Sequence, residues 1–176
     1  MPHHLGQTRS QRRADHLLQT PETFVRAPLP GMRKATAIVH IAPAGGARFT
    51  QYTAELEAGG RLGPAMGQRF LYVLDGELTA EGRRIGPGGF AYLPAAHSGV
   101  VSATASARAV VIEKPYQPLE GVSPPLFLSG TEAAMTPTLL GNDPWLEVRG
   151  LLPDNPAFDF RVNTMTYQPG ASLAAV

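Results

Sequence analysis

Cysteine is absent from the 176-residue chain, and its absence excludes several kinds of chemistry. Without cysteine there is no disulfide framework, no thiolate ligand for zinc and no thiol nucleophile. No apolar run approaches the ~20 residues that span a bilayer, and the N-terminus lacks the apolar stretch of a signal peptide. From these absences we expect a cytoplasmic protein with no membrane segment.

An excess of charge of one sign is also lacking, because the formal net charge is +1 and 16% of the residues are charged. Nucleic acids and anionic membranes are bound by clustered Lys and Arg, so we expect neither partner. The basic cluster Arg9, Arg12 and Arg13 lies near the N-terminus. We expect residues 1–22 to form a solvated N-terminal tail.

Long stretches with helical periodicity are scarce, whereas the chain contains 19 Gly and 17 Pro. This texture predicts short strands and turns, and hence an all-β protein. Asp75-Gly76 and Glu81-Gly82 predict hairpin turns, where glycine supplies a positive φ. The expected strands are 35–41, 48–57, 69–74, 77–80, 89–93, 100–102, 107–114, 145–152 and 158–168.

Residues 68–76 and 88–94 together outline a cupin, the double-stranded β-helix barrel of the jelly-roll type, which we expect to span 23–116. In the general motif Gly-x5-His-x-His-x3-4-Glu-x6-Gly, counting back from Gly76 places the Glu at Arg69. The His pair falls near Gly63 and Ala65, and the last His of the second motif falls on Gly99. None of these side chains binds a metal ion, so the barrel is expected to be metal-free.

The chain changes texture after the expected barrel. Residues 117–144 are rich in Pro and Gly and predict a connector, whereas 145–176 resume strand-like patterns. The late segment repeats an early one, since Phe160, Thr164 and Gly170 align with Phe49, Thr53 and Gly59. An internal repeat of this kind predicts that 145–176 begin a second, incomplete cupin.

Five side chains are candidates for a ligand pocket in the barrel: Gln68, Tyr72, Tyr92, His97 and Glu113. Barrels of this size hold a small ligand as readily as they are filled by side chains, so a filled core with outward polar tips is the alternative. His97 is either a general base or substrate hydrogen-bonder, or a residue at the end of a turn.

Other polar residues have simpler interpretations. We expect His40 to be a structural histidine, and Glu113 and Lys114 to form a surface pair that contributes little. Asp154 and Asp159 are better explained by a loop turn than by an acid/base pair.

Several motifs resemble one family, the bicupin (S)-ureidoglycine aminohydrolases. They are Gln-Arg-Phe-Leu-Tyr-Val-Leu-Asp-Gly from position 68, Glu-Lys-Pro-Tyr-Gln-Pro-Leu-Glu-Gly from 113, Leu-Leu-Pro-Asp-Asn-Pro-Ala-Phe-Asp-Phe from 151 and Tyr-Gln-Pro-Gly-Ala-Ser-Leu from 167. The resemblance implies an N-terminal cupin without metal and a C-terminal cupin that holds manganese. Its ligands would begin with Glu-x-His-x3-His shortly after Pro-Gly-Ala-Ser, and this sequence stops at Val176.

The family reaction is the hydrolytic loss of ammonia from ureidoglycine, which gives ureidoglycolate in purine (allantoin) catabolism. The resemblance therefore predicts the N-terminal part of such a protein, inactive alone, with manganese in the missing half. The alternative is a metal-free cupin that binds a small ureide, organic acid or amide, or that serves as a dimerisation module in a homo-oligomer. Association of two copies into a competent enzyme is not expected, because neither copy supplies metal ligands.

Overall fold

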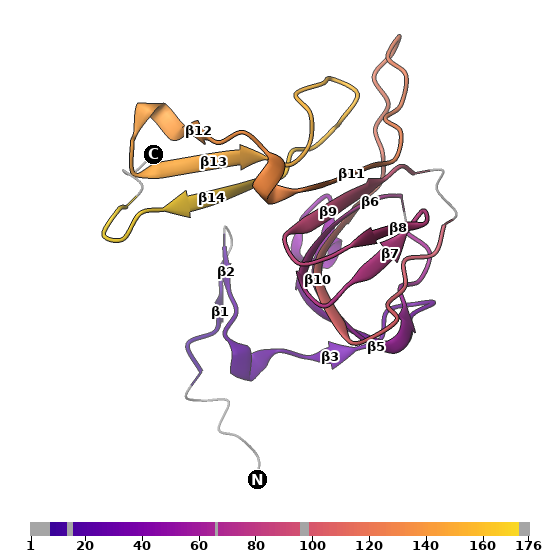
Figure 1. Cartoon of the computed structure of the whole chain (residues 1–176). Coiled ribbons are helices and arrows are strands. Elements are labelled where there is room, and N and C mark those ends of the chain that lie inside the picture. The colour runs from indigo at the N-terminus through magenta and orange to yellow at the C-terminus, as the bar shows by residue number, and fades with distance from the viewer. Residues whose placement is uncertain (1–7, 14–15, 66, 96–98, 173–176) are drawn as a thin grey trace.

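The computed structural model describes residues 8–13, 16–65, 67–95 and 99–172 (Figure 1). These residues form β-strands and short 3-10 helices, with no α-helix among them. The prediction of an all-β protein is confirmed. In this described part, no helix is long and apolar enough to cross a membrane.

Seven antiparallel strands form the main sheet, in the spatial order β11-β9-β6-β10-β5-β4-β3. They are β3 (Arg26–Ala27), β4 (Arg33–Ile41), β5 (Thr50–Arg61), β6 (Gln68–Asp75), β9 (Gly89–Leu93), β10 (Ala107–Lys114) and β11 (Leu128–Thr131). Long strands rich in Val, Ile, Leu, Tyr and Thr suit this pleated wall.

A second, smaller wall closes the barrel. The hairpin β7 (Leu78–Ala80) and β8 (Arg83–Ile85) turns at Glu81-Gly82, where φ is positive at both residues (49° and 69°), as a type I′ turn requires. Residues 101–103 lie between this hairpin and the end of β5: the Thr79 N–H donates to Ser102 O (2.7 Å) and the Leu62 N–H to Val101 O (3.0 Å). These hydrogen bonds join the two walls.

Strands β6 and β9 bury side chains on both of their faces, and each face carries a different set of residues. Inside the barrel pack Leu71 and Val73 of β6 together with side chains from β4, β5, β7, β9 and β10. On the outer face, Phe70 of β6 joins Phe90 and Tyr92 of β9 in a second cluster. This period of two follows from the pleat, which turns successive side chains to opposite faces.

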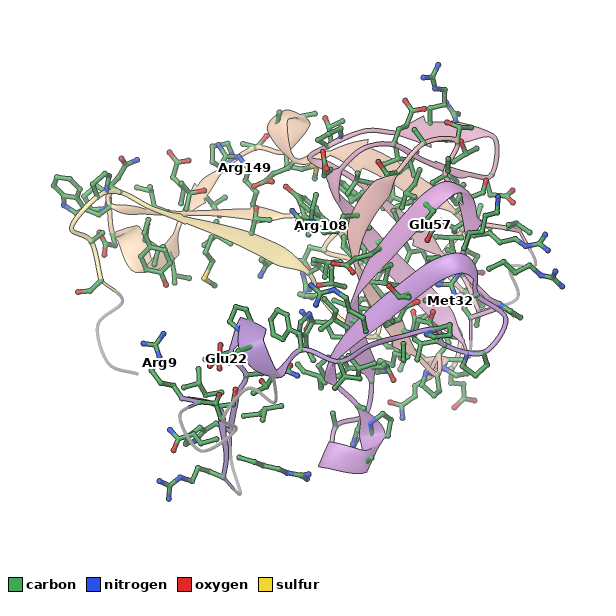
Figure 2. The ribbon with its side chains drawn as sticks, turned by 90° about the horizontal axis from the view of Figure 1, so that it is seen from below. Arg9, Glu22, Met32, Glu57, Arg108 and Arg149 are labelled. Carbon is green, nitrogen blue, oxygen red and sulfur yellow. The ribbon has the colours of Figure 1, made fainter. Side chains whose placement is uncertain are left out.

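The outer cluster is covered by residues from the C-terminal part of the chain. Leu151 and Leu152, with Phe158 and Phe160, pack against it, and the Phe158 ring meets the Tyr92 ring edge-on at 5.0 Å. Beyond it, a three-stranded sheet projects from the barrel in both views (Figures 1 and 2). Its strands are β12 (Thr138–Leu139), β13 (Leu146–Gly150) and β14 (Asn163–Tyr167), preceded or interrupted by the 3-10 helices η4 (Glu132–Ala134) and η5 (Leu140–Asn142).

The N-terminal part is a small structure of its own. Strands β1 (Gln11–Arg12) and β2 (Leu17–Leu18) pair antiparallel, and the 3-10 helix η2 (Pro21–Thr23) follows. The Ser10 hydroxyl accepts the Thr20 N–H (2.8 Å) and fixes this region. The described residues within the expected tail thus include a hairpin whose strand residues are exposed, and Arg12, Arg13 and Leu17 of this hairpin line a pocket together with Val39 and His40 of β4. A further 3-10 helix, η3 (Pro43–Gly45), links β4 to β5.

The expected strands 89–93 and 107–114 have the observed bounds, and those on β4 to β7 shift by a few residues. Residues 100–102 form only two isolated bridges, from Ser102 to Arg61 and to Thr79, and 158–168 become strand only from Asn163. Asp75-Gly76 was expected to turn a hairpin, and this was wrong, because β7 pairs with β8 while β6 pairs with β9 and β10. The expected connector 117–144 contributes β11 to the barrel sheet.

Candidate functional site

A buried ion pair stands at one end of the barrel interior. Arg69 of β6 lies directly opposite Glu113 of β10, and its Nε and Nη2 donate to Glu113 Oε1 at 2.9 and 2.6 Å. The two side chains are 3% and 12% exposed. Because an isolated buried charge is costly, this close pairing is what allows a guanidinium to remain inside the barrel.

The guanidinium is fixed by a third contact, from Arg69 Nη2 to the Gly63 carbonyl oxygen (2.8 Å). Gly63 lies so close to the preceding loop that an added Cβ would stand 2.1 Å from Pro30 O. Only glycine fits there, and the close approach of the two loops carries the Gly63 carbonyl to the guanidinium.

Tyr52 of β5 completes this polar group. It is 1% exposed, and its hydroxyl donates to Glu113 Oε1 at 2.8 Å. Burial, followed by the negative charge of Glu113, raises the pKa of the Tyr52 hydroxyl far above its ordinary value, so Tyr52 is a neutral donor at any physiological pH. Three hydrogen bonds thus converge on one carboxylate oxygen.

A cavity of about 350 Å³ opens onto this group. Its polar lining comes from Thr50, Tyr52, Arg69 and Glu113, and the rest of its wall is mainly apolar. The other lining residues are Leu29, Pro30, Gly31, Met32, Gly63 and Pro64. The volume lies at the lower end of the range for small-molecule sites, and the mixture of apolar walls with a few fixed polar groups is typical of them. We call this cavity the barrel mouth.

The barrel mouth does not fit a metal ion. The position that the cupin motif gives to the ligand Glu holds the Arg69 guanidinium, which carries its own positive charge and has no lone pair to donate. A histidine at Gly63 would collide with the Pro30 carbonyl. Within the described ranges, no group of three or more His, Cys, Asp or Glu is placed to hold a metal ion.

Three of the predicted pocket residues, Gln68, Tyr72 and Tyr92, belong to the outer face of the barrel wall. Gln68 is fully buried, accepts the Tyr92 hydroxyl at 2.9 Å and donates from Nε2 to Asp159 Oδ1 at 2.5 Å. Burial raises the pKa of Tyr92, so this hydroxyl also acts as a neutral donor. Of the predicted set, Glu113 alone lines the barrel mouth among the described residues, and His97 lies outside them.

Lys114 lies beside Gln68 in the β10–β6 pairing and binds the other oxygen of Asp159. The Gln117 N–H also donates to that oxygen, Asp159 Oδ2, at 2.9 Å. Burial raises the pKa of Asp159, but the hydrogen bonds from Lys114, Gln117 and Gln68 outweigh it, so the pKa lies below its ordinary value. We call Gln68, Tyr92, Lys114 and Asp159 the outer network, which ties the C-terminal segment to the barrel.

The expected surface pair of Glu113 and Lys114 was wrong. Neighbouring residues of a strand point to opposite faces, so Glu113 faces Arg69 inside while Lys114 faces Asp159 outside. Each is 12% exposed, and neither carboxylate nor ammonium is a surface group.

Two other polar residues have defined partners. The Tyr72 hydroxyl donates to Glu132 of η4, and this bond raises the pKa of Tyr72 to about 12. His40 contacts Gln19 Oε1 (3.2 Å) and Thr53 Oγ1 (2.9 Å) through its two ring nitrogens, and burial lowers its pKa. Both nitrogens are engaged, as expected of a structural histidine.

Sequence reasoning did not identify Arg69, Tyr52 and Asp159 as members of polar sites. The signal for Arg69 was available, since a strand interior otherwise rich in apolar residues carried one charged side chain that required a partner. The partner lies 44 residues away, and the β10–β6 register that joins the two is not visible in either strand alone.

Comparison with known proteins places this arrangement in context. The chain is 32% identical over 183 residues to the (S)-ureidoglycine aminohydrolase of Arabidopsis thaliana, which covers 98% of this chain. It is 33% identical over 175 residues to a probable (S)-ureidoglycine aminohydrolase of Oryza sativa subsp. japonica, which covers 96% of it. The (S)-ureidoglycine aminohydrolases are homologues of this chain over nearly its whole length. It spans 56% of the length of the rice relative and 61% of that of the Arabidopsis relative.

Solved structures confirm the fold. The crystal structure of the E. coli protein Ylba matches 95% of this chain and 70% of its own, with a TM-score of 0.78 and 24% identity. A putative glyoxylate induced protein from Pseudomonas aeruginosa matches 83% of this chain and 60% of its own, with a TM-score of 0.73 and 26% identity. No protein-family model matches the chain. The expected cupin fold is thereby confirmed, whereas a second, incomplete cupin stays a prediction.

Proposed function

We propose that this chain supplies the metal-free barrel of an (S)-ureidoglycine aminohydrolase and does not hydrolyse ureidoglycine alone. The relatives that carry this name match 96–98% of the chain, which supports the assignment of the reaction. The observation that carries the division of labour is the Arg69 guanidinium, held by Glu113 and Gly63 at the position of a cupin metal ligand. The hydrolytic release of ammonia would then take place in a second, manganese-holding barrel of the whole protein.

The outer network gives the metal-free barrel a concrete task in this proposal. Gln68 and Lys114 bind both oxygens of Asp159, and Leu151, Leu152 and Phe158 fill the apolar surface around them. A charged and hydrogen-bonded contact inside an apolar cluster fixes orientation as well as adding stability. We propose that it holds the C-terminal segment, and whatever follows it, in one orientation on the barrel.

The same proposal gives the protein a place in purine catabolism and in the cytoplasm. The pathway is supported by the substrate in the names of the relatives. The absence of cysteine is compatible with a reducing compartment.

Metal analysis and an activity assay test the proposal. The purified chain, incubated with Mn²⁺ and freed of excess metal, is expected to retain no stoichiometric manganese and to release no ammonia from (S)-ureidoglycine. Stoichiometric manganese or ammonia release by the chain alone would overturn it.

A chimera tests the positive half of the proposal. This chain would replace the segment that it matches in the Arabidopsis thaliana relative, with the unaltered relative as the control. We expect the chimera to bind manganese and to release ammonia from (S)-ureidoglycine. A folded chimera that contains manganese but is inactive would show that this barrel cannot serve such an enzyme.

A further inference from the structure

The barrel mouth is a built site that the metal-free role leaves without a task. Its cavity of about 350 Å³ reaches a fixed polar group inside a barrel whose remaining interior is closely packed with aliphatic side chains. We propose that the barrel mouth binds a small neutral molecule that carries an amide or urea group. This site would act independently of the hydrolytic reaction.

The charges around the cavity select against ions. Arg69 and Glu113 compensate each other at 2.6 Å, and Tyr52 is a neutral hydroxyl. A carboxylate ligand would have to compete with Glu113 for the guanidinium, and an ammonium ligand would have to compete with Arg69 for the carboxylate. Either would leave a buried charge with a weakened partner, which is costly in a site of low dielectric. A neutral ligand avoids this cost.

The hydrogen-bonding groups select for a ligand that both donates and accepts. All three hydrogen bonds to Glu113 from Tyr52 and Arg69 end on Oε1. Among the described residues, no hydrogen bond engages Glu113 Oε2 or Arg69 Nη1, so an acceptor and a donor remain for a ligand. The hydroxyl of Thr50, which lies opposite Glu113 on β5, adds a group that can do either.

Amides and ureas match this combination. Each carries N–H donors for a carboxylate oxygen and a carbonyl that accepts from a guanidinium, without a net charge. The apolar side chains of Leu29, Met32 and Pro64 provide a wall against the remaining carbon atoms of such a molecule. Met32 lies beside the ends of the barrel strands in Figure 2.

The polar group is also ready for a ligand before binding. Arg69 is held on two sides, by Glu113 and by the Gly63 carbonyl, and Tyr52 is packed in the barrel core. Side chains that are already fixed lose little conformational freedom when a ligand arrives, so even a small molecule can bind measurably.

Methionine methyl NMR tests the proposal on the intact chain. Met32 lines the cavity, whereas Met135 packs on the outer cluster and Met165 lies on β14, so these two are internal controls. The chain labelled with ¹³C at its methionine methyl groups would be titrated with propionamide, N-methylurea, propionate and propylammonium, and Met32→Leu would assign the signal. We expect a saturable shift of the Met32 signal with the amide and the urea, and affinities about tenfold lower for the two ions.

Several outcomes would overturn the proposal. These are propionate or propylammonium binding as tightly as propionamide, no saturable Met32 shift with any of the four, or equal shifts of Met32, Met135 and Met165. Because the wild-type titration needs no variant, it decides the matter even if altered proteins fail to fold. It measures no hydrolysis, so its result is separate from that of the ammonia assay.

One variant tests the role of charge balance. In Glu113→Gln the acceptor atom remains but Arg69 is no longer compensated, so the preference is expected to move from propionamide toward propionate. Thr50→Val, which removes one hydroxyl without altering any charge, is the matched control and is expected to weaken the amide without favouring propionate. A Glu113→Gln protein that folds and still prefers the amide by the wild-type ratio would contradict the charge argument.

Discussion

Glu113→Gln is also the sharpest test of how the barrel interior is held together. The substitution keeps the size of the side chain but removes the charge that compensates Arg69, whose side chain is 3% exposed. Removal of one member of a buried ion pair costs about 3–5 kcal/mol, because the other charge is left buried. That loss is a large part of the ~5–15 kcal/mol that stabilises an ordinary domain.

The assay is guanidinium chloride unfolding followed by far-UV circular dichroism, which reports on the strands throughout the barrel. Glu55→Gln is the matched control, because Glu55 makes the same kind of ion pair with Arg26 on the same sheet while the side chains are 31% and 53% exposed. An exposed pair contributes about 0–1 kcal/mol, so the control is expected to lose little.

A double variant separates lost charge from lost packing. Arg69→Met combined with Glu113→Gln removes both charges, so about half or more of the loss in Glu113→Gln is expected to return. The reasoning is refuted if Glu113→Gln loses no more free energy of unfolding than Glu55→Gln. It is also refuted if the double variant is as unstable as the sum of its single substitutions.

Further predictions concern the outer network and Gly63. Gln68→Leu leaves the Tyr92 hydroxyl without its acceptor and is expected to lower the free energy of unfolding by about 1–3 kcal/mol. In a double-mutant cycle with Tyr92→Phe the two losses should be coupled, and additive losses would contradict the hydrogen bond between the two side chains. Because the pKa of Asp159 is depressed in the folded state, its contribution is present above the ordinary carboxyl pKa of about 3.9 and is lost as pH falls below it. Asp159→Asn should flatten the acid limb of an unfolding free energy curve, and an unchanged slope would exclude this role. Gly63→Ala places a Cβ 2.1 Å from Pro30 O and should lower the free energy of unfolding by about 1–3 kcal/mol. Gly86→Ala is the control, because nothing lies within 4 Å of its added Cβ, and it should cause no such loss. Equal midpoints of thermal unfolding for the two variants would refute the close approach at Gly63.

The sequence predicted the fold well where local patterns carry it. The short apolar run of β9, the alternation in β10 and the Glu81-Gly82 turn are local features, and the strand bounds and the type I′ geometry follow from them. β11 was missed because Leu128–Thr131 is short, includes Gly130 and becomes a strand only by pairing with β9. The pairing with β9 therefore decides that this segment is a strand, and its intrinsic β propensity does not.

The candidate site was predicted less well, for a physical reason. Gln68, Tyr72 and Tyr92 were assigned to a pocket because they are polar residues in a barrel wall, whereas both faces of this wall are buried. In a strand buried on both sides, polarity does not reveal which face a residue occupies. Glu113 was identified, but its partners Arg69 and Tyr52 depend on pairing across three strands.

The alternation along β6 and β10 has a consequence for how the chain finds its register. Two neighbouring rungs of this ladder carry different chemistry: Arg69 meets Glu113 on one face, and Gln68 lies beside Lys114 on the other. A slip of β10 by one residue in one direction would place Lys114 opposite Arg69, so that two positive charges would meet inside the barrel. A slip in the other direction would place Glu113 beside Gln68, next to Asp159, and would leave Arg69 opposite Ile112 without its carboxylate. The β10–β6 pairing shifts register between Arg108 and Ala109, and past that shift these adjacent charges make either one-residue misalignment of the two strands unfavourable.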